Sequence, residues 1–449
     1  MDKLTACSLD CYDACAVVYK EEKLKVLKGG HTQGFLCPHL NHYDKFETIS
    51  QARYKGKKIA LDEALIKLKE LLKLSQKDEI LHYRGSGNFG LMQEVTDHFF
   101  SSYGAILTDG TLCDGAGEAG IIKGRGSNKN MPLSEIAKSD VVIIWGRNPH
   151  TTSSHLLPLI KDKEIIVIDP VKTKIAKSAD LNIQIKPHGD LYLAMILTGL
   201  LNKYNSCNEE YYKLIQTIET EAVLKDIGVT PGQLERVLEM IQNKKVAIVC
   251  GVGIQKYSDG ADVMRAIDAF AVTLGLFGKE GCGVSYLGNS KEGITSPFNS
   301  KAKRVSKVNT EFSNYKTVFI QGANPLSQMP DSLRVKESIS RVDNLVYFGL
   351  YENETSELAD LIIPAKSFLY KDDVRTSYSH NAMMNMGKVR DNESGISEYD
   401  LSAYLCRGFD IKLESQKFYL KHFRSFSLEK PDGSLTIKDR ETIPYINCF

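Results

Sequence analysis

Four cysteines near the start of the chain constrain its fold more than any other feature. Cys7, Cys11 and Cys15 follow one another at four-residue intervals in CSLDCYDAC, and Cys37 follows in GFLCPH. In a reducing compartment, clustered thiols indicate a metal or cluster site rather than disulfides. Three close thiolates and one distant thiolate suit a loop wrapped around one [4Fe-4S] cluster. Structural zinc, whose cysteines usually form two close pairs, is the alternative.

Length and charge limit the classes of protein that the chain can belong to. It has 449 residues, which predicts several domains. With 57 Lys+Arg and 56 Asp+Glu, the net charge is +1, so nucleic-acid binding is not expected. The sequence contains no run of 18 apolar residues, so we expect no membrane span. The opening MDKLTAC has no apolar signal core, which predicts a cytoplasmic protein.

Apolar, β-branched runs alternate with amphipathic segments along most of the chain. Strands that are buried on both faces and alternate with helices predict an α/β fold with largely parallel sheets. We expect helices over 61–74, 258–277 and 229–242, the last with Thr230 as N-cap and Pro231 at its first position. The predicted strands are 140–145, 164–169, 244–251, 316–322, 344–350 and 359–365.

One structural unit occurs twice. The first copy is a strand, the turn Gly146-Arg147-Asn148-Pro149, a helix, a second strand and an Ala-Asp step at 179. The second copy repeats this order with Gly322-Ala323-Asn324-Pro325 and an Ala-Asp step at 359. The distance from the Asn to the Ala is 31 residues in one copy and 35 in the other.

Such a unit is typical of a nucleotide site. A glycine turn at the carboxyl end of a parallel strand brings backbone N–H groups close to phosphate, and the following helix presents its positive end. Asp169 ends the next strand 21 residues after Asn148, where an acidic side chain can hold ribose hydroxyls or a base edge. The two copies predict two nucleotide arms. Neither copy contains G-x-G-x-x-G, so ordinary NAD binding is disfavoured, and the alternative is two turns that only close α/β loops.

The cysteine segment CSLDCYDAC…GFLCPHLNHYDK resembles that of the molybdopterin oxidoreductases, the dimethyl sulfoxide reductase and formate dehydrogenase superfamily. It is most similar to the branch that reads CPLDCPDTC. The resemblance continues in order through LCDGAGEAG, WGRNP, KPHGD, GVGIQKYSDG, QGANP and SELADLIIPAKSFLYKDD, and covers roughly residues 4–390. It implies a multidomain α/β molybdopterin oxidoreductase fold with an N-terminal iron-sulfur subdomain and two Rossmann-like parallel-sheet domains.

The resemblance also implies domain limits. Residues 1–50 form the iron-sulfur subdomain, 51–110 and 301–365 form the two parts of one α/β domain, and 111–300 form the other. Residues 366–449 return to the iron-sulfur subdomain and end in a tail, with a hairpin expected at PDGS.

In this family, molybdenum or tungsten is bound by the dithiolenes of one or two pterin guanine dinucleotides. Cys113 falls at the position of the side-chain metal ligand, although an inert buried cysteine is the alternative. A helix that starts after Cys113 would favour its thiolate. The implied cofactor-binding residues are Gly146, Arg147, Asn148, Pro149, Asp169 and Asp190 for one nucleotide, Gly251, Gly253 and Gln255 near the metal and pterin, and Gly322, Asn324 and Pro325 for the other nucleotide.

Three residues depart from the family pattern. His39 stands where most relatives have a Lys that bridges cluster and pterin, and its charge depends on pH. Asp114 stands where formate dehydrogenases have His, and Gly288 where they have Arg. A formate anion would meet a carboxylate without a cationic partner, so formate oxidation is not expected. Asp114 is a candidate general acid or base, with a solvated or turn-capping role as the alternative.

The function implied is two-electron transfer of an oxygen atom or hydride on a small substrate, with electrons passing through the cluster to a redox partner protein. Relatives usually continue into a C-terminal β-barrel domain that closes over both cofactor arms. The resemblance therefore implies that a separate subunit replaces this domain, that the cofactor is held differently, or that the chain is degenerate. One alternative is a non-catalytic iron-sulfur subunit for electron transfer or scaffolding in a larger complex. The others are non-redox hydration in the same superfamily and a zinc-clamped nucleotide-binding protein.

Overall fold

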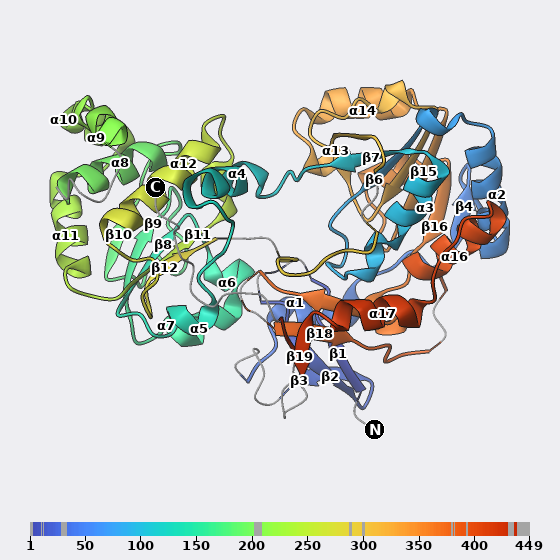
Figure 1. The fold of residues 1–449 in the computed structure, drawn as a ribbon, viewed down its shortest axis with the longest axis horizontal. Coiled ribbons are helices and arrows are strands. Elements are labelled where there is room, and N and C mark those ends of the chain that lie inside the picture. Colours follow the sequence, from blue (N-terminus) through green and yellow to red (C-terminus); the bar gives the residue numbers. More distant parts are fainter. Residues whose placement is uncertain are drawn as a thin grey trace.

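The chain folds into two α/β lobes above a smaller subdomain (Figure 1). The computed structural model describes residues 3–9, 11, 13–27, 34–201, 209–286, 290–298, 301–378, 380, 382–391, 394–429 and 435–437. The predicted α/β class with parallel sheets is confirmed. No helix in this described part of the chain combines the length and the apolar character needed to cross a membrane.

The first lobe is built on a parallel five-stranded sheet. Its strand order is β10 (Leu181–Ile183), β9 (Glu164–Ile168), β8 (Val141–Trp145), β11 (Val246–Cys250) and β12 (Gly283–Ser285). The three central strands are buried along their whole length or nearly so. The lobe contains the helices α4 (Gly115–Arg125), α5 (Leu133–Ile136), α6 (Pro149–Thr152), α7 (Leu157–Ile160), α8 (Asp190–Leu200), α9 (Glu209–Gln216), α10 (Thr220–Ile227), α11 (Pro231–Ile241) and α12 (Gly260–Thr273).

Alternate residues of β8 face opposite cores. Val141, Ile143 and Trp145 pack with the longer helices α4, α8, α11 and α12, whereas Val142 and Ile144 pack with α5 and α7. This two-sided burial explains the continuous apolar runs of the sequence.

The second lobe is built on an eight-stranded sheet. Its strand order is β13 (Arg304–Ser306), β7 (Ile106–Asp109), β6 (Ile80–Arg84), β14 (Thr317–Gln321), β15 (Asn344–Gly349), β16 (Leu361–Pro364), β4 (Ala52–Tyr54) and β5 (Lys57–Ile59). All neighbours from β13 to β16 are parallel, and β4 and β5 join antiparallel. The covering helices are α2 (Leu61–Lys73), α3 (Val95–Tyr103), α13 (Pro325–Gln328), α14 (Ser332–Ser340), α15 (Glu354–Glu357) and α16 (Glu398–Gly408).

The chain reverses its direction of winding between β6 and β14. From β6 it continues to β7 on one side, and from β14 it continues to β15 on the other. The carboxyl ends of strands at such a switch point are the usual place for a ligand in an open α/β sheet.

The subdomain combines the two ends of the described chain. One sheet contains β1 (Lys3–Ala6), β2 (Ala16–Lys20) and β3 (Lys23–Val26), and the other contains β17 (Asp373–Thr376), β18 (Ala382–Met386), β20 (Leu435–Ile437) and β19 (Ser427–Glu429). Helices α1 (Pro38–Asn41) and α17 (Gln416–Arg424) accompany them. β19 pairs with β20 in antiparallel orientation, and the hairpin turn predicted at PDGS lies outside the described residues.

The predicted helices and strands are present. Each of the six predicted strands coincides with an observed strand. Thr230 caps α11 in a capping box with Gln233, and Pro231 is the first helical residue. The domain limits given above remain a prediction.

Candidate cofactor-binding site

The four predicted cluster cysteines converge in the subdomain. Cys7 and Cys15 are buried, Cys11 and Cys37 are half-buried, and all four are free thiols. Three sulfurs accept backbone N–H groups: Cys7 from Leu9 at 3.4 Å, Cys11 from Asp13 at 3.4 Å and Cys37 from Leu40 at 3.5 Å. We call the described residues between Cys7 and Cys37 the cysteine loop.

Three of these thiols have raised pKa values. Burial raises the pKa of Cys7 to about 12 and the pKa of Cys11 to about 11. Burial raises the pKa of Cys15 further, and each of the other three thiols adds to this effect. Cys7, Cys11 and Cys15 therefore stay protonated at neutral pH, and binding a metal would release their protons.

Arg375 ties the cysteine loop to the rest of the subdomain. Its side chain is 1% exposed and donates to the carbonyl oxygens of Cys7 and, at 2.8 Å, Leu9. The guanidinium also lowers the pKa of Cys7, although by less than burial raises it. A buried cation thus lies beside the start of the cysteine loop, at Cys7 and Leu9.

The two glycine turns of the repeat make the same contacts. Gly146 has a positive φ of 61° and Gly322 one of 53°. The Gly146 N–H donates to Ile168 in β9 at 2.8 Å, and the Gly322 N–H donates to Phe348 in β15 at 2.9 Å. Both turns therefore have a glycine of positive φ that bonds the equivalent second strand of its own unit, as the sequence repeat predicts.

Each unit of the repeat also includes a third strand with its own glycine turn, which the sequence repeat did not show. Gly251 follows β11 and donates to Trp145 at 2.8 Å, and Gly85 follows β6 and donates to Gln321 at 2.8 Å. A Cβ on Gly251 would lie 1.8 Å from the Gly146 oxygen, and one on Gly85 would lie 2.3 Å from the Gly322 oxygen. Each unit is thus a pair of glycine turns in close backbone contact at the carboxyl ends of adjacent strands.

The Ala-Asp steps of the repeat have a structural role. Asp180 accepts the N–H of Ile165 at 2.7 Å, and Asp360 accepts the N–H of Leu345 at 2.9 Å. Each carboxylate thereby fixes the start of the second strand of its unit. The helices after the turns, α6 and α13, are one turn long. The expected positive helix end is therefore weak, and the backbone N–H groups are the main anion-binding feature.

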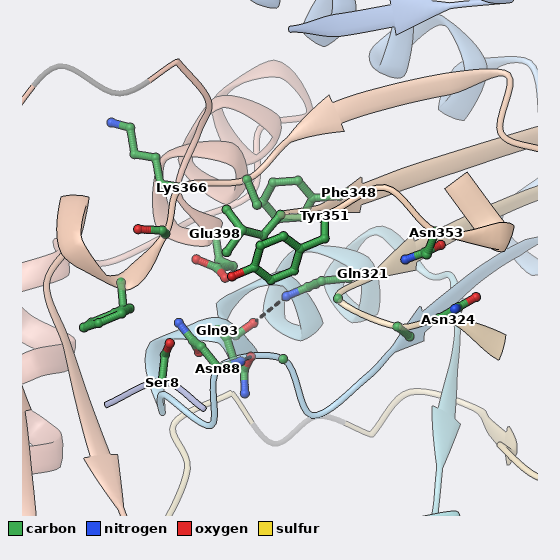
Figure 2. A pocket seen from close by; sticks show the side chains of 18 of the residues that line it. Ser8, Asn88, Gln93, Gln321, Asn324, Phe348, Tyr351, Asn353, Lys366 and Glu398 are labelled. Carbon is green, nitrogen blue, oxygen red and sulfur yellow. Dashed lines mark hydrogen bonds between the residues drawn. The ribbon is translucent and has the colours of Figure 1, made fainter. Parts of the chain in front are cut away.

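A cavity of ≈ 310 Å³ lies beside the second glycine turn (Figure 2). Gly322 and Asn324 line it from the turn, Asn88 lines it from the loop after β6, and Ser8 lines it from the cysteine loop. The volume is within the range of small-molecule sites. The Nδ2 of Asn88 is buried without a hydrogen-bond partner in the described part of the chain. An unpaired donor at the cavity suits a ligand with an acceptor.

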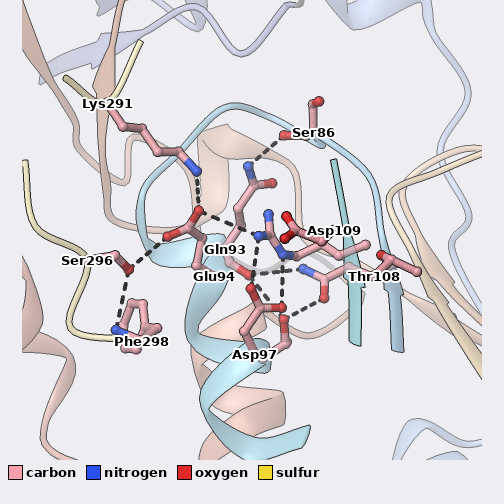
Figure 3. A network of polar contacts seen from close by, with 12 residues as sticks. Ser86, Gln93, Glu94, Asp97, Thr108, Asp109, Lys291, Ser296 and Phe298 are labelled. Carbon is pink, nitrogen blue, oxygen red and sulfur yellow. Dashed lines mark hydrogen bonds and ion pairs between the residues drawn. The ribbon is translucent and has the colours of Figure 1, made fainter. Parts of the chain in front are cut away.

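A polar network holds the loop after β6 in place (Figure 3). Arg84 donates to Asp97 at 2.9 and 3.1 Å, and Glu94 accepts from Lys291 and Ser296. Burial raises the pKa of Asp97, but Arg84 and His82 outweigh burial and hold that pKa well below its usual range. Gln93 and Gln321 both line the cavity, and the Gln321 Nε2 donates to the Gln93 oxygen at 3.1 Å. The network therefore reaches the cavity wall.

Cys113 and Asp114 lie in the segment that joins the two lobes. Cys113 is exposed, and α4 begins two residues later. Asp114 is 9% exposed and accepts from Thr111 at 3.0 Å. Burial raises the pKa of Asp114, more than Thr111 lowers it.

Two side chains from the loop after β11 hold the Cys113 backbone. Gln255 donates to the Cys113 oxygen at 2.7 Å and accepts from Gly117 at 2.8 Å, so it bridges Cys113 and α4. Lys256 donates to the oxygens of Leu112 and, at 2.6 Å, Cys113. Lys256 places a cation near Cys113 that the sequence argument against an anionic substrate had not included.

Other predicted residues have structural partners. Arg147 donates to Ser153 and to the Cys250 oxygen, Asp190 accepts the Trp145 indole N–H at 2.7 Å, and Asp169 accepts the Val171 N–H at 2.8 Å. Burial raises the pKa of Asp169 and of Asp190. Their contacts with a nucleotide remain predictions.

The remaining predicted residues lie in or beside the turns. Asn148 donates to Thr151 at 3.0 Å, and its Oδ1 is buried without a partner among the described residues. Asn324 bonds Glu354 and Thr355 at 2.6 and 2.7 Å. Pro149 and Pro325 begin α6 and α13, and Gly253 has open space around its α-carbon. His39 is exposed, and Gly288 lies outside the described residues.

A buried carboxyl group lies close to the wall of the cavity. Asp373, at the start of β17, is 2% exposed. Its Oδ1 accepts the N–H groups of Met92 and Val374 at 2.8 and 2.7 Å. Burial raises the pKa of Asp373 to about 7, and nearby Glu398 also raises it, whereas Lys371 lowers it.

Asp373→Asn is expected to make the protein more stable above pH 7 and to have little effect near pH 4. In the wild type, the protonated Asp373 carboxyl stabilises the folded state, and the ionised carboxylate does not. That contribution is fully present below the ordinary pKa of 3.8 and is lost as the pH rises to about 7. Asn retains the accepting oxygen and does not ionise. At about 1.4 kcal/mol per pKa unit, the gain is a few kcal/mol, measurable by urea unfolding from pH 4 to 8.

Asp372→Asn is the matched control, because Asp372 is the exposed neighbour in the sequence. It should leave the pH dependence unchanged. A parallel pH profile for Asp373→Asn and the wild type would contradict the expectation.

Comparison with known proteins identifies the family. The family model described as molybdopterin oxidoreductase matches residues 58–399. The chain belongs to the molybdopterin oxidoreductase family. Membership implies a molybdenum- or tungsten-pterin cofactor, in agreement with the paired glycine turns and the cavity.

Similar molybdopterin oxidoreductases include named and solved proteins. The chain is 27% identical to "Probable oxidoreductase YyaE" of Bacillus subtilis (strain 168), over 88% of this chain and 67% of that protein. It is 26% identical to the F420-dependent formate dehydrogenase subunit alpha of Methanocaldococcus jannaschii, over 55% of this chain and 44% of that protein. The chain thus spans about two thirds or less of these curated relatives.

A solved structure has the same fold. Acetylene hydratase from Pelobacter acetylenicus superposes with a TM-score of 0.74 at 15% sequence identity, over 94% of this chain and 70% of that chain. At this identity the likeness concerns the fold alone.

The sequence did not indicate several residues that shape the candidate site. Gly85 was detectable, since it follows a strand as Gly251 does. Lys256, Arg375 and His155 carry no local signal, because each acts on a segment more than 100 residues away.

Proposed function

We propose that the chain is a molybdenum- or tungsten-dependent oxidoreductase that transfers an oxygen atom or hydride on a small substrate and passes electrons through a [4Fe-4S] cluster. The observation that carries this proposal is the cavity of the second glycine turn, which ends at Ser8 and Leu9, directly after Cys7. A ligand in that cavity would lie next to the cysteine loop. Electron transfer between two cofactors needs this kind of proximity.

The arrangement of the cysteines favours a cluster over zinc. A zinc ion binds each sulfur at about 2.3 Å, so its four ligands surround one point. In the described residues, no three His, Cys, Asp or Glu side chains are placed to share one ion. Cys7, Cys11 and Cys37 nevertheless lie near enough to Cys15 to raise its pKa. Thiolates spread around a larger group, with one on each iron, match both observations.

Residues of both lobes would hold the pterin cofactor. We assign one guanine dinucleotide to the Gly146 turn with Gly251, and a second to the Gly322 turn with Gly85. The bound metal would supply two-electron redox chemistry at the segment between the lobes. Cys113 is the proposed side-chain ligand, and Gln255 and Lys256 fix its backbone. Asp114 is the proposed proton donor or acceptor, since it is adjacent and largely shielded from solvent.

The reducing equivalents would leave through the subdomain to a redox partner protein. Lys256 places a cation near Cys113, but Asp114 places a carboxylate directly beside it, so we do not propose formate as substrate, although relatives include formate dehydrogenases. The cytoplasmic location and the separate capping subunit stay predictions.

Anaerobically purified protein is expected to contain about four irons and close to one molybdenum or tungsten per chain, measured by elemental analysis. Cys11→Ala removes one proposed ligand and should lose most of the iron. Cys406→Ala is the matched control, since Cys406 is buried in the second lobe, apart from the cysteine loop, and it should retain all the iron.

The metal content also separates the alternatives. Four irons without molybdenum or tungsten would favour the non-catalytic electron-transfer or scaffold subunit. Zinc in place of iron, or full iron in Cys11→Ala, would contradict the cluster.

A further inference from the structure

One buried histidine of the first lobe reaches into the cysteine loop. His155 is 1% exposed and lies nine residues after the Gly146 turn. Its Nδ1 is 2.8 Å from the Asp13 carboxylate and 3.5 Å from the Cys15 sulfur, and its Nε2 is 4.0 Å from the same sulfur. The Asp13 carboxylate also accepts the backbone N–H of His155 at 3.3 Å.

The second half of the cysteine loop holds the same imidazole ring. The His155 Nε2 lies 3.1 Å from the Phe35 carbonyl oxygen, which can only accept, so Nε2 donates. The Phe35 ring stacks on the imidazole with centroids 4.4 Å apart. His155 therefore contacts the loop next to Cys15 and, through Phe35, two residues before Cys37.

A short series of contacts leads from His155 to the first glycine turn. Ser153, two residues earlier, accepts from the Arg147 guanidinium, and Arg147 also donates to the Cys250 oxygen at 3.4 Å. Cys250 directly precedes Gly251. The Cys15 sulfur is thus connected to both turns of the first unit through His155, the short backbone segment from His155 to Ser153, and the Arg147 side chain.

His39 has a different environment. It stands where relatives place a lysine between cluster and pterin, but here its side chain is exposed on α1. His155, by contrast, is enclosed between the cysteine loop and the first lobe.

We propose that His155, and not His39, is the positioning residue between the iron-sulfur cluster and the first nucleotide unit, and that its contact with the Cys15 sulfur raises the reduction potential of the cluster. The inference rests on the proposed function, because it requires the cluster. The Nδ1 hydrogen, which the Asp13 carboxylate accepts at 2.8 Å, also faces the Cys15 sulfur at 3.5 Å. A polar hydrogen shared with a cluster sulfur stabilises the reduced, more negative state, which makes reduction more favourable.

The test is an EPR-monitored redox titration of the holoenzyme, together with iron analysis. His155→Phe keeps an aromatic ring for stacking on Phe35 and removes both ring N–H groups. It should make cluster reduction at least tenfold less favourable, which is 59 mV for one electron, with iron content unchanged. His155→Gln keeps an amide donor, so its cluster should have a reduction potential between those of His155→Phe and the wild type. His39→Gln should match the wild type.

A merely structural role would leave the potential unmoved in variants that retain their iron, and this result would overturn the inference. A shift in His39→Gln as large as that in the His155 variants would also overturn it. Where His155→Phe loses iron, His155→Gln decides: a lowered potential supports the inference, and a wild-type potential overturns it. A wild-type protein without a cluster signal would instead refute the proposed function itself.

Discussion

Arg125→Met is expected to reduce the free energy of unfolding by about 3–5 kcal/mol. Arg125 in α4 and Asp268 in α12 form a buried pair, with side chains 1% and 4% exposed and two contacts of 2.6 Å. Methionine fills much of the volume but leaves the Asp268 carboxylate without its cation. Burial already raises the pKa of Asp268 despite Arg125. The variant should therefore recover stability as the pH falls, because the carboxyl then takes up a proton.

Urea unfolding at pH 8 and pH 5 measures both effects. Arg265→Met is the matched control, because Arg265 lies on α12 and pairs with Asp262 on the surface. A double variant, Arg125→Met with Asp268→Leu, should regain most of the stability, since apolar residues replace a buried pair at little cost. Equal losses in Arg125→Met and Arg265→Met would contradict the expectation.

The Arg125 variant also bears on the proposed metal site. Helix α4 starts at Gly115, two residues after Cys113. If its C-terminal end at Arg125 loosens, the Cys113 segment loses its support. We therefore expect the molybdenum or tungsten content to fall with stability, while the iron content stays at the wild-type level.

Gly251→Ala is expected to lower the free energy of unfolding by about 3 kcal/mol and to abolish pterin binding. The new Cβ would lie 1.8 Å from the Gly146 oxygen and 3.1 Å from the Arg147 α-carbon. Both contacts are backbone, so the two turns must separate, and the Gly251 to Trp145 hydrogen bond breaks with them. Urea unfolding and the nucleotide released per chain on acid denaturation measure the two effects.

Gly253→Ala provides the control within the same loop. A Cβ there meets nothing within 4 Å, so the stability should change by less than about 0.5 kcal/mol. Equal nucleotide content in Gly251→Ala and the wild type would show that the close contact between the turns is not needed for the cofactor.

The parts of the fold that depend on local pattern were predictable. The apolar runs of β8 and β14 and the repeated GxNP turns are visible in the sequence, and each has the expected place in a parallel sheet. The pairing of Gly251 with Gly146, and of Gly85 with Gly322, was not visible as a second repeat. It depends on which strands become neighbours, and neighbours in a sheet need not be close in sequence.

The candidate site was predictable in its cysteines and turns but not in its supports. His155 lies 118 residues after Cys37, and it meets the cysteine loop only because the first lobe packs on the subdomain. The same holds for Arg375, which comes from the far end of the chain. Single charged or aromatic residues give no periodic signal, so only the packed structure shows what they touch.

The first lobe interrupts the second, and this order has a consequence during protein synthesis. β6 and β7 emerge from the ribosome early, but the partner of β6 on its other side, β14, begins 208 residues after β7 ends. At roughly 5–20 residues per second, translation takes roughly 10–40 s to supply it. During this delay, β6 presents an unpaired edge to other nascent chains. The first lobe can fold during this time, so chaperone protection is needed mainly for the incomplete eight-stranded sheet of the second lobe.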